Sequence, residues 1–121
     1  MAACRRPNTT VRLIFMSESQ QFLYSLRPTR LEMLTEEPTD REQAVVAEHF
    51  AYLQRLGKEG IVRIAGRTSD QGPDTVGIVI LEVQDEVVAK QIMGQDPAVC
   101  DGVLAASLQP FRIAVDAADM D

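Results

Sequence analysis

Residues 61–83, with the sequence IVRIAGRTSDQGPDTVGIVILEV, decide the fold. Both ends of this stretch are rich in β-branched residues, which predicts one strand over 61–67 and another over 76–83. The polar run over 68–74 predicts a loop between them. The chain therefore places two strands in succession, with no helix between them.

A strand and a long connection begin the folded part of the chain. Alternating apolar residues from Gln20 predict a strand over 20–27, which Pro28 ends. Residues 28–38 are irregular but carry apolar side chains. Because long irregular connections often serve a function, we expect this segment to form a lid or a loop beside a site.

A helix is predicted to follow this connection. Thr39 and Glu42 have the spacing of a capping box, in which each side chain satisfies a free backbone donor of the first turn. Gly60 lies just past the predicted end, where a glycine ends helices readily. One face of the helix carries an apolar stripe with a histidine in it, made of Val45, Val46, His49, Leu53 and Leu56.

A second helix is predicted over 85–93, with Gly94 as its end, and a last strand over 103–115. Pro110 marks either a break in that strand or a position at the edge of the sheet. The order strand, helix, strand, strand, helix, strand predicts a ferredoxin-like α+β fold. Right-handed crossovers place both helices on one face of a four-stranded antiparallel sheet.

The chain of 121 residues has room for one domain, which we assign to residues 19–116. Residues 1–18 lack a core pattern and are expected to be disordered, with Met16 a possible alternative start. Residues 117–121 form an acidic tail.

Charge and cysteine content narrow the functional classes. The net charge of −6 argues against a nucleic-acid partner, and no apolar run is long enough to cross a membrane. Cys4 and Cys100 are far apart and have no spacing motif, so we expect reduced thiols in a cytoplasmic protein. Phosphate-loop, dinucleotide-binding, zinc-site and nucleophile-elbow motifs are all missing.

The strand over 76–83 is apolar on both faces, although the helices can cover only one face of the sheet. A large uncovered apolar patch favours a partner, and a second copy of the chain is the simplest one. We therefore predict a homodimer whose sheets face each other, through Val79 and Leu81 or through the alternating set of residues. The alternative is an unusually apolar solvent face.

His49 and Asp96 are the candidates for acid–base chemistry. His49 is the only histidine, and a carboxylate beside it would make it a usable general acid or base. A purely structural histidine, bonded to a backbone carbonyl, is the alternative. Asp96 precedes Pro97, where an aspartate often only caps a turn or a short helix.

Arg27, Arg30 and Arg67 are candidates for holding a small anion, because a guanidinium donates forked hydrogen bonds. Ordinary surface arginines are the alternative. Tyr24, on the first strand, is a further candidate for contact with a substrate.

Four short motifs resemble the YciI-like family. They are AEHFAYL at 47–53, IAGR at 64–67, DPAV at 96–99 followed by Gly102-Val103, and QPF at 109–111. The resemblance covers roughly residues 20–115. It implies a ferredoxin-like fold that dimerises as an α+β barrel, with a histidine of the first helix and the aspartate of the Asp-Pro motif paired in a cleft. His49 and Asp96 match those two positions.

Many members of that family have proline where this chain has Arg67, which implies a different pocket and favours an anionic ligand. The activity of the family is mostly unestablished. One similar type of protein eliminates chloride from a chlorinated hydroxyquinol, and relatives of the broader fold include muconolactone isomerases and cofactor-free oxygenases.

Residues and resemblance together predict a site that works without a metal or an organic cofactor. We expect His49, oriented by Asp96, to move a proton on a small organic acid or phenol, followed by elimination or isomerisation. The alternatives are a non-catalytic dimeric module that binds a small ligand or assists another protein, and a purely structural dimer.

Overall fold

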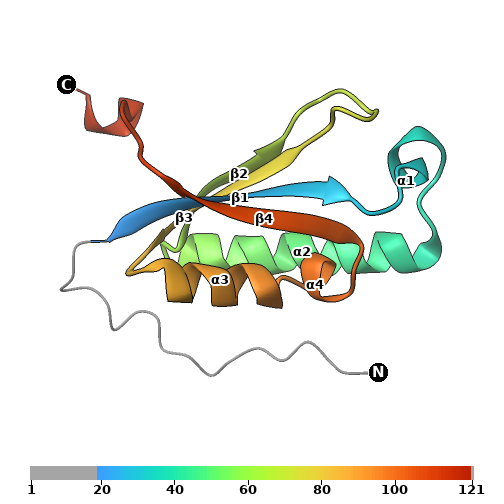
Figure 1. Ribbon diagram of the computed structural model, residues 1–121, viewed down its shortest axis with the longest axis horizontal. Coiled ribbons are helices and arrows are strands. Elements are labelled where there is room, and N and C mark those ends of the chain that lie inside the picture. The colour runs from blue at the N-terminus through green and yellow to red at the C-terminus, as the bar shows by residue number, and fades with distance from the viewer. Residues whose placement is uncertain (1–18, 121) are drawn as a thin grey trace.

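The computed structural model describes residues 19–120. Its sheet has the order β2-β3-β1-β4, and every neighbouring pair is antiparallel. Helices cover one face of this sheet and leave the other face bare (Figure 1). The predicted ferredoxin-like α+β fold is thereby confirmed. The strands are β1 (Gln20–Pro28), β2 (Val62–Arg67), β3 (Gly77–Val83) and β4 (Leu104–Phe111).

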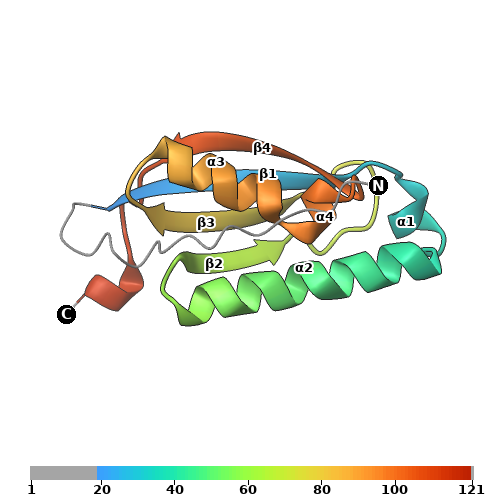
Figure 2. The same ribbon diagram turned by 90° about the horizontal axis from the view of Figure 1, so that it is seen from below.

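Two long helices and two short ones complete the domain. Figure 2 shows α2 along the β2 side of the sheet and α3 with α4 along the β1 and β4 side. The C-terminal segment ends in a short 3₁₀ helix, η2 (Ala117–Asp119). The helices are α1 (Glu32–Thr35), α2 (Asp40–Lys58), α3 (Glu86–Gln95) and α4 (Pro97–Cys100).

The predicted capping box begins α2. The Thr39 hydroxyl accepts a hydrogen bond from the Glu42 amide at 3.1 Å, and the Glu42 carboxylate accepts one from the Thr39 amide at 2.8 Å. Gly60, with a φ of +80°, follows the end of the helix in a conformation that favours glycine. Sequence signals thus set both ends of α2.

The second half of the domain differs from the prediction in its helix ends. α3 continues through Gly94 to Gln95, and a separate helix, α4, follows at once. Pro97 causes this break, because the residue before a proline avoids the helical conformation. β4 ends at Phe111 and not at 115. Pro110 lies on this strand at the edge of the sheet, where a residue without an amide proton is tolerated because one side of the strand has no neighbour.

The main core lies between the helices and the covered face of the sheet. Phe22, Tyr24 and Leu26 project from β1 into it and pack with side chains of α2 and α3. Val79 and Leu81 are fully buried on this same face. They cannot form the predicted contact between two sheets, so that choice of residues was wrong, and only the alternating set remains.

The bare face carries that alternating set. Ile80 lies opposite Leu23 on β1 and opposite Ile64 on β2, and Ile78 lies opposite Ser25. A register shift between Val62 and Ile64 turns β2 locally, so Val62 packs against the core while Ile64 is 61% exposed. We call Leu23, Ile64, Ile78 and Ile80 the open-face patch.

Two predictions lie outside the described residues 19–120: the expected disorder of residues 1–18 and the expected reduced thiol of Cys4. No cysteine within 19–120 is free, so the predicted reduced thiol at Cys100 is wrong. That prediction rested on a long separation along the chain, which does not limit proximity in space. Among the described residues, no helix is long and apolar enough to cross a membrane.

Candidate functional site

Asp96 occupies the corner between α3 and α4, where Pro97 restricts its backbone to an extended conformation (φ −59°, ψ 124°). In this position its carboxylate caps α4, because the Ala98 amide donates to Oδ1 at 3.0 Å. The side chain has no exposed surface. The local sequence therefore places a fully buried acid at a fixed point beneath the sheet.

His49 reaches this acid from α2. Its Nδ1 lies 2.7 Å from Oδ1 and 2.8 Å from Oδ2 of Asp96, and the side chain is 13% exposed. The two alternatives for Asp96 turn out to be compatible, since one carboxylate both caps a short helix and pairs with the histidine. For His49, the bonded partner is this side chain and not a backbone carbonyl.

Tyr24 completes the group from the sheet. Its hydroxyl donates to Oδ2 of Asp96 at 2.9 Å. Burial raises the pKa of this hydroxyl far above its usual range, and the negative charge of Asp96 raises the pKa further. Tyr24 therefore stays protonated and serves Asp96 as a donor.

These contacts assign the protons of the group. The Ala98 amide and the Tyr24 hydroxyl both donate to the oxygens of Asp96, and the third partner is an imidazole nitrogen of His49. Asp96 is therefore the acceptor, and Nδ1 of His49 carries the proton. Nε2 then has a free lone pair and can accept a proton from a ligand.

A cleft of about 830 Å³ opens beside His49. Its walls come from β1, the segment around α1, α2, the ends of β2 and β3, and Leu104 of β4. Most of the lining is apolar; its polar members include Glu36, Glu42, His49, Arg67, Gln71 and Thr75. The segment 28–38, predicted to be a lid or a site loop, supplies part of this lining.

The structure separates the three candidate arginines. Arg67 lines the cleft. Arg30 instead donates to both Glu42 oxygens, at 2.8 and 2.7 Å, and Arg27 donates to the backbone oxygen of Thr75 at 3.2 Å. Neither Arg27 nor Arg30 is among the lining residues.

Tyr24 also lies outside the lining, because β1 buries it beneath Asp96. Its predicted contact with a substrate is therefore replaced by a contact with the acid. The strand pattern places Tyr24 on the covered face, but it gives no sign of the hydrogen bond to Asp96.

The bond between Arg30 and Glu42 had no sequence signal beyond the capping box. Hydrogen bonds from Arg30, and then from the Thr39 amide, lower the pKa of Glu42 to about 2. Arg30 also donates to the backbone oxygen of Glu37 at 3.2 Å. This ion pair ties the segment around α1 to the start of α2 and so shapes one wall of the cleft.

Within residues 19–120, no group of three histidine, cysteine or acidic side chains is placed to hold a metal ion. The groups of the site that can take part in chemistry are the His49 imidazole, the Asp96 carboxylate and the Arg67 guanidinium, beside the apolar walls of the cleft.

The four-stranded sheet, its helices and the histidine–carboxylate pair beside an apolar cleft together describe a small ferredoxin-like α+β domain. The chain belongs to the YCII-related domain family, whose model matches residues 17–111. This membership confirms the resemblance seen in the sequence.

Solved structures agree with this assignment. One similar structure is the 5-chloro-2-hydroxyhydroquinone dehydrochlorinase (TftG) from Burkholderia phenoliruptrix AC1100, in complex with 2,5-dihydroxybenzoquinone. The match has a TM-score of 0.54 at 20% sequence identity and covers 75% of this chain and 93% of the other. At this identity the likeness establishes the fold. No curated protein matches the chain.

Proposed function

We propose that this protein is a cofactor-free acid–base enzyme that acts on a small organic acid or phenol by elimination or isomerisation. The observation that carries the proposal is the pair of hydrogen bonds between His49 Nδ1 and the buried Asp96 carboxylate, at 2.7 and 2.8 Å. This contact leaves Nε2 as the ring nitrogen available to a ligand in the cleft.

In this reaction Nε2 takes a proton from the substrate, and the electron pair of the broken bond stays on the substrate. The Asp96 carboxylate stabilises the imidazolium that forms. In an elimination the electron pair forms a new double bond, and the leaving group departs as an anion with its own pair. In an isomerisation the proton returns to a different atom.

Two further observations support this chemistry. The cleft is large enough for a single ring with substituents, and its walls are mostly apolar. The similar dehydrochlorinase, by its name, removes chloride from a hydroxylated ring. Such a reaction needs a group that moves protons and needs no oxidant.

Solvent deuterium provides the test, because a proton removed from carbon is replaced from D₂O when the atom is reprotonated, while an elimination appears in the same spectra as loss of the substrate signals. Small ring carboxylates and hydroquinones, with and without chlorine, are incubated with the protein in D₂O and followed by NMR. We expect deuterium at carbon with at least one of them, and a rate about 10²–10⁴-fold lower in His49→Gln.

Glu48→Gln is the matched control, since Glu48 is the preceding residue and is exposed outside the cleft lining. It should keep the wild-type rate. If wild type and His49→Gln exchange equally, or if saturable binding occurs without exchange and without loss of substrate, the non-catalytic ligand-binding module becomes the better explanation.

We propose further that the protein works as a homodimer in which two open-face patches pack together. In this patch Ile64 is exposed, Leu23 and Ile78 are half-buried and Ile80 is buried, and no element of residues 19–120 is seen over this face in Figure 1 except the C-terminal segment near one end. The cytoplasmic location stays a prediction from the sequence.

A further inference from the structure

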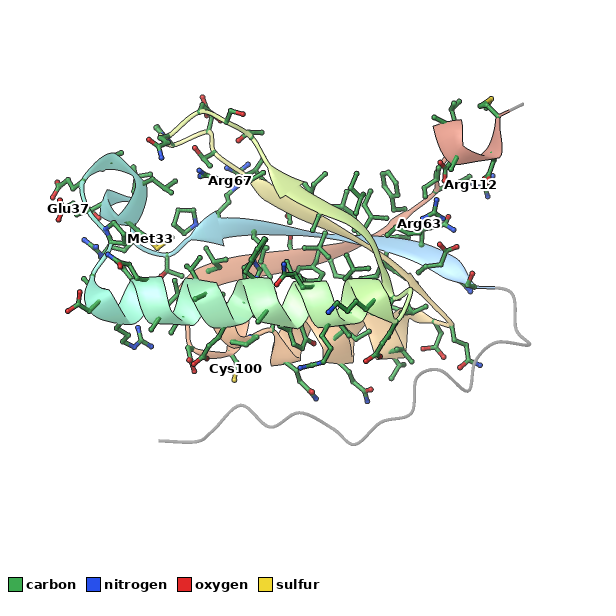
Figure 3. The ribbon with its side chains drawn as sticks, turned by 180° about the vertical axis from the view of Figure 1, so that it is seen from behind. Met33, Glu37, Arg63, Arg67, Cys100 and Arg112 are labelled. Carbon is green, nitrogen blue, oxygen red and sulfur yellow. The ribbon has the colours of Figure 1, made fainter. Side chains whose placement is uncertain are left out.

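Arg67 stands at the end of β2, opposite Gly77 of β3, and lines the cleft. Figure 3 shows it at the same end of the sheet as Met33 and Glu37 of the segment around α1, with Arg63 and Arg112 at the far end. Gly77 itself has no side chain, and Leu26 of β1 packs against this strand position, so the accessible volume beside Arg67 is the cleft that both residues line. Arg67 is thus a cation beside an accessible volume.

The other arginines near acids are already neutralised. Arg30 is paired with Glu42 at 2.7 Å, and Arg63 is paired with both Glu82 and Asp116. Among the described carboxylates, none lies within ion-pair distance of Arg67. The remaining acid in the lining, Glu36, is exposed beside the end of α1. The guanidinium of Arg67 is therefore the cleft's unneutralised positive charge.

The Arg67 side chain is exposed, and most of the cleft that it lines is apolar. Leu26 and Val79 line the adjoining part of the sheet, and Phe50 lines the cleft from α2. A ligand that fills this volume would displace water, and an ion pair strengthens when water is excluded. The cleft therefore suits a molecule with an apolar body and one anionic group.

We propose that Arg67 binds the carboxylate of the substrate, so that the cleft accepts small apolar or aromatic monocarboxylates in preference to uncharged phenols. A carboxylic acid is ionised at neutral pH, whereas a phenol, with a pKa near 10, is not. The planar guanidinium also matches the two oxygens of a carboxylate. This inference rests on the proposed function and names the class of its substrate.

Benzoate and its uncharged isostere benzamide are the probes, compared at fixed ionic strength. Binding is followed through the ring proton resonances of His49, which are unambiguous because the chain has one histidine. We expect wild type to bind benzoate about 10- to 100-fold more tightly than benzamide, as for hydrogen bonds to a charged group. Arg67→Gln should remove this preference, and Arg67→Lys should restore part of it.

Arg41→Gln is the matched control, because it makes the same change in charge at an exposed arginine that donates to the backbone oxygen of Asp101, outside the cleft lining. It should keep the full preference for benzoate. Equal affinity for both probes in wild type, no saturable benzoate binding, or an unchanged preference in Arg67→Gln would each overturn the proposal.

A second readout separates this proposal from the proposed function. Benzoate binding to His49→Gln, followed by calorimetry, should keep its preference over benzamide, because Arg67 is intact. A preserved preference together with unchanged deuterium exchange in His49→Gln would refute the catalytic proposal alone. An unchanged preference for benzoate in Arg67→Gln, together with exchange that is lost in His49→Gln, would refute this inference alone.

Discussion

The Tyr24 hydroxyl lies 2.9 Å from Oδ2 of Asp96, and the two residues are 72 positions apart in the chain. This bond joins the central strand β1 to the corner between α3 and α4. With the bonds from His49 on α2, it fixes the Asp96 carboxylate from two elements, β1 and α2. The acid is thus held in place by tertiary structure as well as by its own helix cap.

This relationship predicts the cost of removing the Tyr24 hydroxyl. Tyr24→Phe should lower the free energy of unfolding by about 1.5–3 kcal/mol, the range for hydrogen bonds to charged groups. Tyr52→Phe is the matched control, because the buried Tyr52 hydroxyl donates to the uncharged backbone oxygen of Ile92 at 2.7 Å. It should cost about 0.5–1.5 kcal/mol in the same urea titrations. An equal or larger loss in Tyr52→Phe would contradict a charged Asp96.

Substitutions of Asp96 should separate its two contacts. Asparagine keeps an oxygen that can accept from the Ala98 amide, whereas alanine does not, so Asp96→Ala should cost about 0.5–2 kcal/mol more in unfolding free energy than Asp96→Asn. Both variants lose the negative charge beside His49 and should lose most of the deuterium exchange. Wild-type exchange in Asp96→Asn would contradict a role for the carboxylate in proton transfer.

The Arg30–Glu42 pair predicts a dependence of stability on pH. The pKa of Glu42 falls from 4.5 to about 2 in the folded protein, so the pair's contribution is complete above about pH 4.5 and fades as the pH falls toward 2. Wild type should therefore exceed Glu42→Gln in stability at pH 6, and the difference should shrink steadily below pH 4.5. Urea unfolding at several pH values measures this, and a difference that is constant with pH would contradict the assignment.

The open-face patch predicts the effect of a buried charge on association. Wild type should show about twice the chain mass in sedimentation equilibrium at micromolar concentration. Ile64→Asp should shift it to the monomer, because dimerisation would bury an unpaired carboxylate. Val87→Asp is the control, since Val87 on α3 is 63% exposed against 61% for Ile64 but lies on the helix side. A monomeric wild type, or equal dissociation by both variants, would refute the proposed interface.

The sequence predicted much of the fold because its signals are local. Alternation marked the strands, and Thr39 with Glu42 marked the start of α2. The order of these strands and helices along the chain then predicted the ferredoxin-like arrangement. The errors arose where one local signal competed with another: Gly94 predicted the end of α3, but the conformational restriction before Pro97 decided it one residue later.

The candidate site was predictable only in part. His49 and Asp96 could be named from residue type and from the family resemblance, and the structure brings them into contact. The sequence could not show that only Arg67 of the three arginines lines the cleft, because this depends on the hydrogen-bond partners of each side chain in the folded protein. Arg30, for example, binds Glu42, which is 12 positions away in the chain. The sequence also could not show which face of the sheet Val79 occupies. β3 is apolar at every position from 78 to 81, and a shift of one residue in its pairing would exchange the two faces.

Because Asp96 caps α4, the presence of this aspartate in a related chain does not by itself indicate an active site. A related chain without the proposed reaction would still benefit from an aspartate before this proline, because the short helix needs its acceptor whatever the cleft binds. His49 forms hydrogen bonds, in the described structure, only to Asp96. Among related chains, the presence of this histidine, and not of the aspartate, should therefore distinguish members with the proposed acid–base activity from members that share only the fold.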